Sequence, residues 1–105
     1  KEVFGPVLTW NTFKSDDEVI EVANATEYGL AATLFTGDEA RAMRIASAVV
    51  AGTVWVNCFF IRELAAPFGG SRNSGIGREG GIWSFDFYCD IKNIAVRKGS
   101  FAGAA

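Results

Sequence analysis

Apolar and polar residues alternate along this chain in blocks that predict strands and helices in turn. Blocks rich in β-branched and aromatic residues predict strands over residues 7–13, 30–36 and 53–57. Two helical segments separate these strands, and the second carries its apolar residues at helical spacing: Ala42, Ile45, Ala46, Val49 and Val50. Because the connections are too long for hairpins, the β-α-β-α-β order predicts an α/β fold with a parallel sheet and right-handed crossovers.

Local signals predict where these elements begin and end. Residues 15–18 form a capping box, in which the Ser15 hydroxyl accepts from the Glu18 amide while the Glu18 carboxylate reaches back. Gly29 and Gly52 are predicted to end the two helices, because glycine easily adopts the conformation that closes a helix. The middle strand is an almost continuous apolar run, which predicts that both of its faces are buried.

A glycine-dense stretch over residues 67–81 follows this unit and predicts a structured functional loop. Residues 58–66 follow the third strand, and ligands of open α/β sheets bind beyond the carboxyl ends of strands. The two segments are therefore predicted to form the site. A short helix over 83–88 and a strand over 91–97 come next, and residues 98–105 are expected to fray.

Composition limits the classes of function. Hydrophobic residues make up 50% of only 105 residues, so we expect some apolar surface to be covered by protein outside this chain. The net charge of -2 argues against nucleic-acid partners, and no apolar run is long enough for a membrane span. The absence of histidine excludes Ser-His and Cys-His nucleophile pairs and most zinc sites, so no metal is expected. Two cysteines without metal or disulfide spacing suit the cytoplasm.

Three features suggest chemistry but also have plainer explanations. Residues 75–80 match G-x-G-x-x-G, yet the sequence before them does not end in a strand and no long helix is predicted after them. Cys58 and Cys89 have no titrating partner nearby in sequence, which favours buried, unreactive thiols. Arg62 either forms a solvated pair with Glu63 or clamps a carboxylate in bidentate fashion, and its immediate sequence favours the solvated pair.

Three motifs together resemble the NAD(P)-dependent aldehyde dehydrogenase family. Residues 2–7 look like its E-x-F-G-P-V motif, and residues 52–57 look like its G-x-V-W-V-N segment. Residues 67–79 look like its P-F-G-G-x-K-x-S-G-x-G-R-E block, with Arg72 where lysine is usual. Their order and spacing hold across almost the whole chain.

The resemblance implies that this chain is the C-terminal part of such an enzyme. Residues 1–90 would then be the last part of the catalytic domain, 91–97 an oligomerisation strand and 98–105 a flexible tail. The family's nucleophilic cysteine, general-base glutamate and Rossmann domain would lie upstream, so this chain is expected to hold no catalytic residue and to be inactive alone. In the complete enzyme the thiolate of that cysteine would attack the aldehyde, hydride transfer to NAD would then leave a thioester, and hydrolysis of the thioester would give the acid.

The same resemblance implies cofactor- and substrate-binding residues. Glu2 matches the glutamate that hydrogen-bonds the nicotinamide ribose, and Phe4 matches the phenylalanine packed near the nicotinamide, so both are expected to bind NAD or NADP. Phe68 matches the aromatic residue that lines the substrate tunnel. We therefore expect Glu2, Phe4 and Phe68 to contribute to one pocket.

Residues 60–64 and 84–88 further resemble the branch of 5-carboxymethyl-2-hydroxymuconate and hydroxymuconic semialdehyde dehydrogenases. Substrates of that branch carry carboxylates, which raises the carboxylate-clamp interpretation of Arg62 above the solvated pair. Arg62, Leu64 and Phe68 are accordingly the predicted substrate-binding residues, and the predicted substrate is a carboxylated semialdehyde.

The expected partners are the remainder of the enzyme and further copies of the same chain, in a dimer or tetramer. Two other hypotheses stay open. The chain is a free-standing interaction module if its last strand, residues 91–96, offers an exposed edge to another protein. It is a small dinucleotide-binding domain if residues 75–80 cradle a pyrophosphate.

Overall fold

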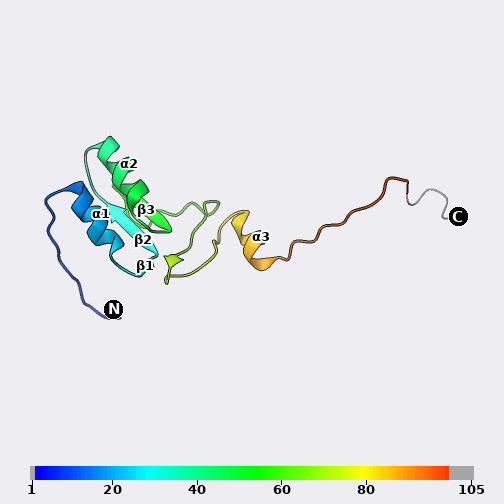
Figure 1. Ribbon diagram of the computed structural model, residues 1–105, viewed down its shortest axis with the longest axis horizontal. Helices are drawn as coiled ribbons and strands as arrows, with labels where there is room; N and C mark the ends of the chain where they lie inside the picture. Colours follow the sequence, from blue (N-terminus) through cyan, green and yellow to red (C-terminus); the bar gives the residue numbers. More distant parts are fainter. Residues whose placement is uncertain (1, 100–105) are drawn as a thin grey trace.

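The computed structural model describes residues 2–99, and its helices and short strands lie between residues 16 and 88 (Figure 1). In chain order the elements are α1 (Asp16–Asn24), β1 (Tyr28–Gly29), β2 (Ala31–Leu34), α2 (Glu39–Ala48), β3 (Thr53–Val56), β4 (Ser71–Arg72) and α3 (Trp83–Tyr88). None of the helices within residues 2–99 is long and apolar enough to cross a membrane.

Side chains cap the starts of both longer helices. The Ser15 hydroxyl accepts from the Glu18 amide at 3.2 Å, which confirms the Ser15 cap. The Glu18 carboxylate also reaches back, but it accepts from the Lys14 amide at 2.7 Å, one residue before the N-cap. At the start of α2, the Asp38 carboxylate accepts from the Arg41 amide at 3.0 Å. Polar residues at these two places therefore satisfy amides that the helices leave free.

The predicted helix ends are wrong, because α1 ends at Asn24 and α2 at Ala48, well before Gly29 and Gly52. The Asn24 side chain explains the second end. Its Nδ2 donates to the Ala48 carbonyl at 2.9 Å, and its Oδ1 accepts from the Val50 amide at 2.8 Å. A side chain from α1 thus replaces the glycine that commonly closes a helix.

The central sheet is a parallel pair. β2 runs beside β3 in a register from Ala31 opposite Thr53 to Leu34 opposite Val56, and α2 makes the crossover between them. The Asn57 side chain extends the pairing past β3, because it donates to the Thr36 carbonyl and accepts from the Thr36 amide. The α/β character is confirmed, with β2, α2 and β3 as its parallel unit.

The strand predicted over residues 7–13 is not formed, and these residues run as an exposed arm (Figure 1). β-branched and aromatic residues favour a strand only when a partner strand and a packing surface are at hand. β2 also alternates exposed and half-buried residues, so the expected burial of both its faces is wrong. One face of the sheet lacks the cover that a doubly buried strand requires.

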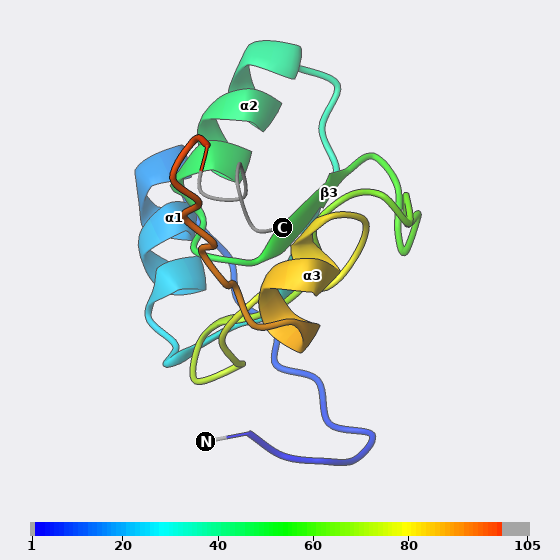
Figure 2. The same ribbon diagram turned by 90° about the vertical axis from the view of Figure 1, so that its right-hand side faces the viewer.

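The buried core is small. α1 packs on α2 and α2 packs on β3 (Figure 2), and Ala42, Ile45 and Trp55 are the buried apolar residues among those described.

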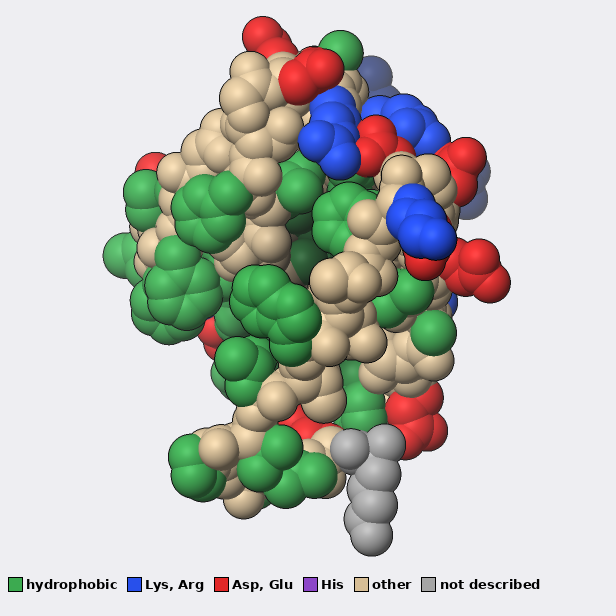
Figure 3. All heavy atoms as spheres, turned by 90° about the vertical axis from the view of Figure 1, so that its left-hand side faces the viewer, with side chains coloured by type: hydrophobic (Ala, Val, Ile, Leu, Met, Phe, Trp, Pro, Cys, Tyr) green, Lys and Arg blue, Asp and Glu red, His purple; other side chains and the backbone are tan. Residues whose placement is uncertain are grey.

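The accessible surface is 8911 Å², whereas a compact protein of 11.3 kDa exposes about 5,700 Å². The radius of gyration is 21.3 Å instead of about 13 Å. Apolar side chains accordingly gather on the surface (Figure 3).

The C-terminal segment leaves the body of the molecule. The predicted helix over 83–88 is confirmed as α3, and the chain beyond it extends away from the other elements (Figure 1). The strand predicted over residues 91–97 is not formed, because no described segment lies alongside to pair with it. Most of the predicted tail, residues 98–105, lies outside the described residues.

Asp16 connects α1 to α2 through two arginines, at 2.6 Å from Arg41 and 3.1 Å from Arg44. The hydrogen bond from Arg41 is the main cause that lowers the pKa of Asp16 below its ordinary value of 3.8. Because the pKa of Asp16 is lowered in the folded state, its carboxylate stabilises the fold at pH values above the unfolded-state pKa. This contribution is lost as the pH falls through the folded-state pKa. We therefore expect Asp16→Asn to lower the melting temperature slightly at neutral pH and to have no effect in strong acid.

The effect is measured as the melting temperature of the variant and its parent, followed by circular dichroism from neutral pH to strong acid. Glu21→Gln is the matched control, because Glu21 is an exposed acidic residue on the same helix. A deficit of Asp16→Asn that persisted in strong acid, or an equal deficit for both variants at neutral pH, would contradict the ion-pair explanation.

Candidate functional site

Trp55, buried in β3, holds the loop that carries Arg62. Its Nε1 donates to the Ile61 carbonyl at 2.8 Å, and its ring centroid lies 5.8 Å from that of Phe59 and 6.0 Å from that of Phe60. Phe60 has a φ of 56°, a conformation that costs energy for a bulky residue and persists only where neighbours enforce it. The backbone just before Arg62 is therefore held in place by packing against Trp55 of β3.

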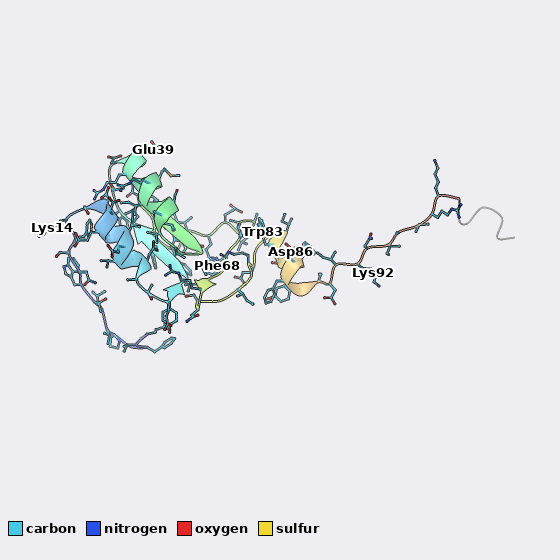
Figure 4. The ribbon with its side chains drawn as sticks, in the orientation of Figure 1. Lys14, Glu39, Phe68, Trp83, Asp86 and Lys92 are labelled. Atoms are coloured by element: carbon cyan, nitrogen blue, oxygen red, sulfur yellow. The ribbon has the colours of Figure 1, made fainter. Side chains whose placement is uncertain are left out.

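Arg62 lies between an aromatic ring and a carboxylate. Its guanidinium carbon is 4.2 Å from the centroid of the Phe68 ring, and its Nη2 donates to Glu79 Oε1 at 3.0 Å. Two predicted substrate-binding residues, Arg62 and Phe68, are thus in contact. Phe68 lies in the part of the chain between β3 and α3 (Figure 4). The alternative pairing of Arg62 with Glu63 is not what the structure shows, since the acidic partner is Glu79.

A short backbone bridge brings Phe68 and Glu79 together. Each donates its amide to the carbonyl of the other at 2.8 Å, as in an antiparallel hydrogen-bonded pair. Residues directly opposite in such a pair place their side chains on the same face. This local geometry explains how a loop presents a ring and a carboxylate to the same guanidinium.

A mostly apolar recess of about 290 Å³ adjoins this cluster. Phe68 and Glu79 line it from the glycine-rich loop, and Phe87 and Tyr88 line it from α3, with their ring centroids 4.8 Å apart. Binding sites for small molecules combine apolar walls with a few placed polar groups, as this recess does.

Leu64, the third predicted substrate residue, is not seen against Arg62 or Phe68. Its side chain is 79% exposed, and its carbonyl accepts from the Gly81 amide at 3.0 Å. The hydrogen bond ties one end of the glycine-rich loop to the segment after β3. A role of the Leu64 side chain in substrate binding stays a prediction.

Two arginines anchor the glycine-rich loop. Arg78 Nη1 donates to the Gly70 and Gly77 carbonyls at 2.7 Å each. Arg72 Nη1 donates to the Asn24 carbonyl at 2.8 Å, at the C-terminal end of α1, where a cation also interacts favourably with the helix dipole. The loop is therefore held both within itself and to α1.

Sequence reasoning missed the roles of Glu79, Arg72 and Arg78. Glu79 lies 17 positions after Arg62, so no local spacing links the two. The only available signal was that all three are charged residues within a glycine-rich loop.

Residues 75–80 do not form a dinucleotide fingerprint. Gly75, Gly77 and Gly80 have positive φ values of 140°, 78° and 102°. β4, which precedes them, has two residues, and α3, which follows, has six. A fingerprint needs a strand that leads directly into a long helix, so this arrangement does not support the dinucleotide-binding hypothesis.

The predicted cofactor residues lie apart from the Arg62 cluster. Glu2 lines a cavity of about 700 Å³ that includes Tyr28. The pKa of the Tyr28 hydroxyl is raised above its ordinary value, and the nearby Glu27 carboxylate is the main cause. Partial burial and Glu2 add to the effect. Phe4 is 94% exposed. The single pocket expected for Glu2, Phe4 and Phe68 is therefore not assembled within the described chain.

The two cysteines differ from the expected buried thiols. Cys58 is half-buried and Cys89 is exposed. Among residues 2–99, no group of three or more histidine, cysteine or acidic side chains is arranged to hold a metal ion.

Comparison with known proteins assigns the chain to a family. The profile of the aldehyde dehydrogenase family matches residues 1–94. The chain is 50% identical over 97 residues both to 2-hydroxymuconic semialdehyde dehydrogenase of Pseudomonas sp. (strain CF600) and to 2-aminomuconic semialdehyde dehydrogenase of Homo sapiens. Each alignment covers 92% of this chain and 20% of the relative, so the chain spans about a fifth of the length of these curated relatives.

The fold agrees with that assignment. The crystal structure of HpcC from Thermus thermophilus superposes with a TM-score of 0.87 at 49% identity, over 91% of this chain and 19% of that protein. Both the sequence match and the structural match extend over nearly the whole of this chain. The chain belongs to the aldehyde dehydrogenase family.

Proposed function

We propose that this chain is the C-terminal portion of a dehydrogenase that oxidises a carboxylated semialdehyde to the acid with NAD or NADP. The observation that carries the substrate class is Arg62, whose guanidinium is held 4.2 Å over the Phe68 ring beside an apolar recess. A fixed guanidinium recognises a carboxylate with paired hydrogen bonds. Phe68 and Leu64 are proposed as apolar walls for the carbon chain between the carboxylate and the aldehyde.

The large exposed surface of this chain supports the view that the active site needs further protein. About 3,000 Å² of surface is exposed beyond what a compact chain of this mass exposes. We propose that the nucleophilic cysteine, its general base and the Rossmann domain lie in that remainder. The acid would form there by hydrolysis of a thioester on that cysteine. This chain alone is expected to be inactive, and turnover by the pure chain would contradict the proposal.

Glu2 and Phe4 are the residues of this chain that would hold the cofactor. The Glu2 carboxylate lines a large cavity and suits the acceptance of hydrogen bonds from ribose hydroxyls. Phe4 offers an aromatic face for a nicotinamide ring. NAD or NADP supplies the hydride acceptor when it is bound. The part of Glu2 and Phe4 is to orient the ring toward the aldehyde carbon.

A substitution of Arg62 tests the substrate class. In the complete enzyme, we expect Arg62→Leu to lower kcat/KM for 6-oxohexanoate, a carboxylated aldehyde, by about 10- to 100-fold relative to hexanal, since a hydrogen bond to a charged group contributes about 1.5–3 kcal/mol. The two substrates have the same carbon chain, so the ratio of their kcat/KM values isolates the carboxylate.

Arg41→Leu is the matched control, because Arg41 is a paired arginine on α2 and bonds Asp16 on α1. It should leave the ratio of the two substrates unchanged. Equal losses on both substrates for Arg62→Leu would remove Arg62 from the substrate site.

An interaction module is the second candidate function. Residues 91–97 extend away from the body of the molecule (Figure 1). Ile91 and Ile94 in this segment are exposed. We propose that this segment pairs with a second copy of the chain in a homo-oligomer, as a strand that adds to an open sheet edge. Sedimentation tests this proposal, because a strictly monomeric and well-folded protein would contradict it.

A further inference from the structure

We propose that Glu79 is a positioning residue that sets the preference for carboxylated aldehydes. Its carboxylate holds the Arg62 guanidinium over Phe68 and leaves one edge of the guanidinium open for the substrate carboxylate. The inference rests on the proposed function above, in which Arg62 receives that carboxylate.

Two contacts of different kinds define the place of the guanidinium. Its central carbon lies over the Phe68 ring, and its Nη2 donates to Glu79 Oε1 at 3.0 Å. The side chain of Arg62 is 36% exposed. A cation–π contact at an exposed site is weak beside the rotamer entropy of arginine, so the ring alone does not hold one orientation. The carboxylate supplies the second constraint.

The backbone places Glu79 where this constraint is effective. The reciprocal hydrogen bonds between Phe68 and Glu79, each 2.8 Å, keep the ring and the carboxylate at a fixed distance from each other. Arg78, the neighbour of Glu79, further ties this part of the loop to the Gly70 and Gly77 carbonyls. The partner of Arg62 is therefore itself held by the loop.

One bond from Nη2 leaves the arginine able to bind a second carboxylate. A guanidinium has five N–H donors, arranged as two edges that each offer a pair of nearly parallel donors. Glu79 occupies a single donor, and within the described chain no other group bonds the Arg62 side chain. A complete edge remains for the substrate.

The length of the Glu79 side chain then matters more than its charge. Glutamine has the same length and keeps an oxygen that accepts from Nη2. Aspartate keeps the charge but is one methylene shorter and does not span the distance to Nη2. Alanine removes the contact altogether.

The experiment measures KM and kcat for 6-oxohexanoate and hexanal in the complete enzyme. We expect Glu79→Asp and Glu79→Ala to raise the KM ratio of 6-oxohexanoate to hexanal by about 10-fold, with little change in the kcat ratio, because they release a charged hydrogen bond. Glu79→Gln should keep the ratio within about 3-fold of the parent enzyme, since a neutral acceptor still satisfies the donor. Calorimetry with adipate, a dicarboxylate without an aldehyde, should show the same order of affinities.

The double variant separates this proposal from the function on which it rests. In an Arg62→Leu background, Glu79→Asp should have no further effect on the ratio, because it acts only through Arg62. If Arg62→Leu itself leaves the ratio unchanged, the proposed substrate site fails. If Arg62→Leu changes the ratio and Glu79→Asp does not, or if both act independently, the positioning role of Glu79 alone is overturned. Aspartate and glutamine variants keep the test available if Glu79→Ala does not fold.

Discussion

Gly52→Ala is expected to destabilise the protein by about 3 kcal/mol or more, because overpacking against backbone leaves no side chain free to move aside. A Cβ at Gly52 would lie 1.6 Å from the Gly69 carbonyl oxygen and 2.8 Å from its carbon. Gly52 itself cannot retreat, since its amide donates to the Gly29 and Leu30 carbonyls at 3.0 and 3.1 Å. The segment that leads into β3 and the glycine-rich loop touch backbone to backbone at this point.

Urea unfolding of the variant and its parent measures the loss. Gly37→Ala is the matched control, because a Cβ at Gly37 would meet nothing within 4 Å. A Gly52→Ala protein as stable as the Gly37→Ala protein would show that the two backbones do not meet as described.

Removing the Trp55 ring should be the second large effect. Trp55→Ala empties a buried aromatic site, and such changes cost about 3–5 kcal/mol. Trp55→Phe is more informative, because it keeps an aromatic ring and deletes only the Nε1 donor that holds the Ile61 carbonyl at 2.8 Å. We expect it to cost about 1 kcal/mol. It should also weaken the preference for carboxylated aldehydes, since the bond fixes the residue before Arg62.

Unfolding in urea and the kcat/KM ratio of 6-oxohexanoate to hexanal measure the two effects of Trp55→Phe. Trp10→Phe is the control, because Trp10 is 84% exposed and makes no ring contact among the described residues. If Trp55→Phe matched Trp10→Phe in both measurements, the hydrogen bond to Ile61 would have no part in positioning Arg62.

Local patterns predicted the elements whose stability is local. The Ser15 cap and the parallel pairing of β2 with β3 follow from neighbouring residues or from one short crossover. Of the apolar face predicted for α2, Ala42 and Ile45 are buried, whereas Val49 and Val50 lie beyond the end of the helix. The strands predicted over 7–13 and 91–97 are not formed within the described chain, because their stability is not local. Their composition suits a strand, but a strand forms only beside a partner, and the described chain provides none.

The candidate site was predictable only in part. Motif resemblance singled out Arg62 and Phe68, which the structure brings into contact. The hydrogen bond between Arg62 and Glu79 joins residues 17 positions apart in a loop that folds back on itself. A periodic sequence pattern does not predict such a contact. The link from Asn24 to Val50 was missed on the same grounds, because a side-chain cap from another helix leaves no mark in the capped segment.

The extended segment after α3 has a consequence for biosynthesis. In the homo-oligomer proposed above, residues 91–97 leave the ribosome after all the described helices and strands, so the sheet edge proposed to receive them stays open until then. Until then, the exposed Ile91 and Ile94 of a newly made chain are accessible to chaperones. With the proposed pairing, chaperone retention would therefore depend on how soon a second copy of the chain arrives.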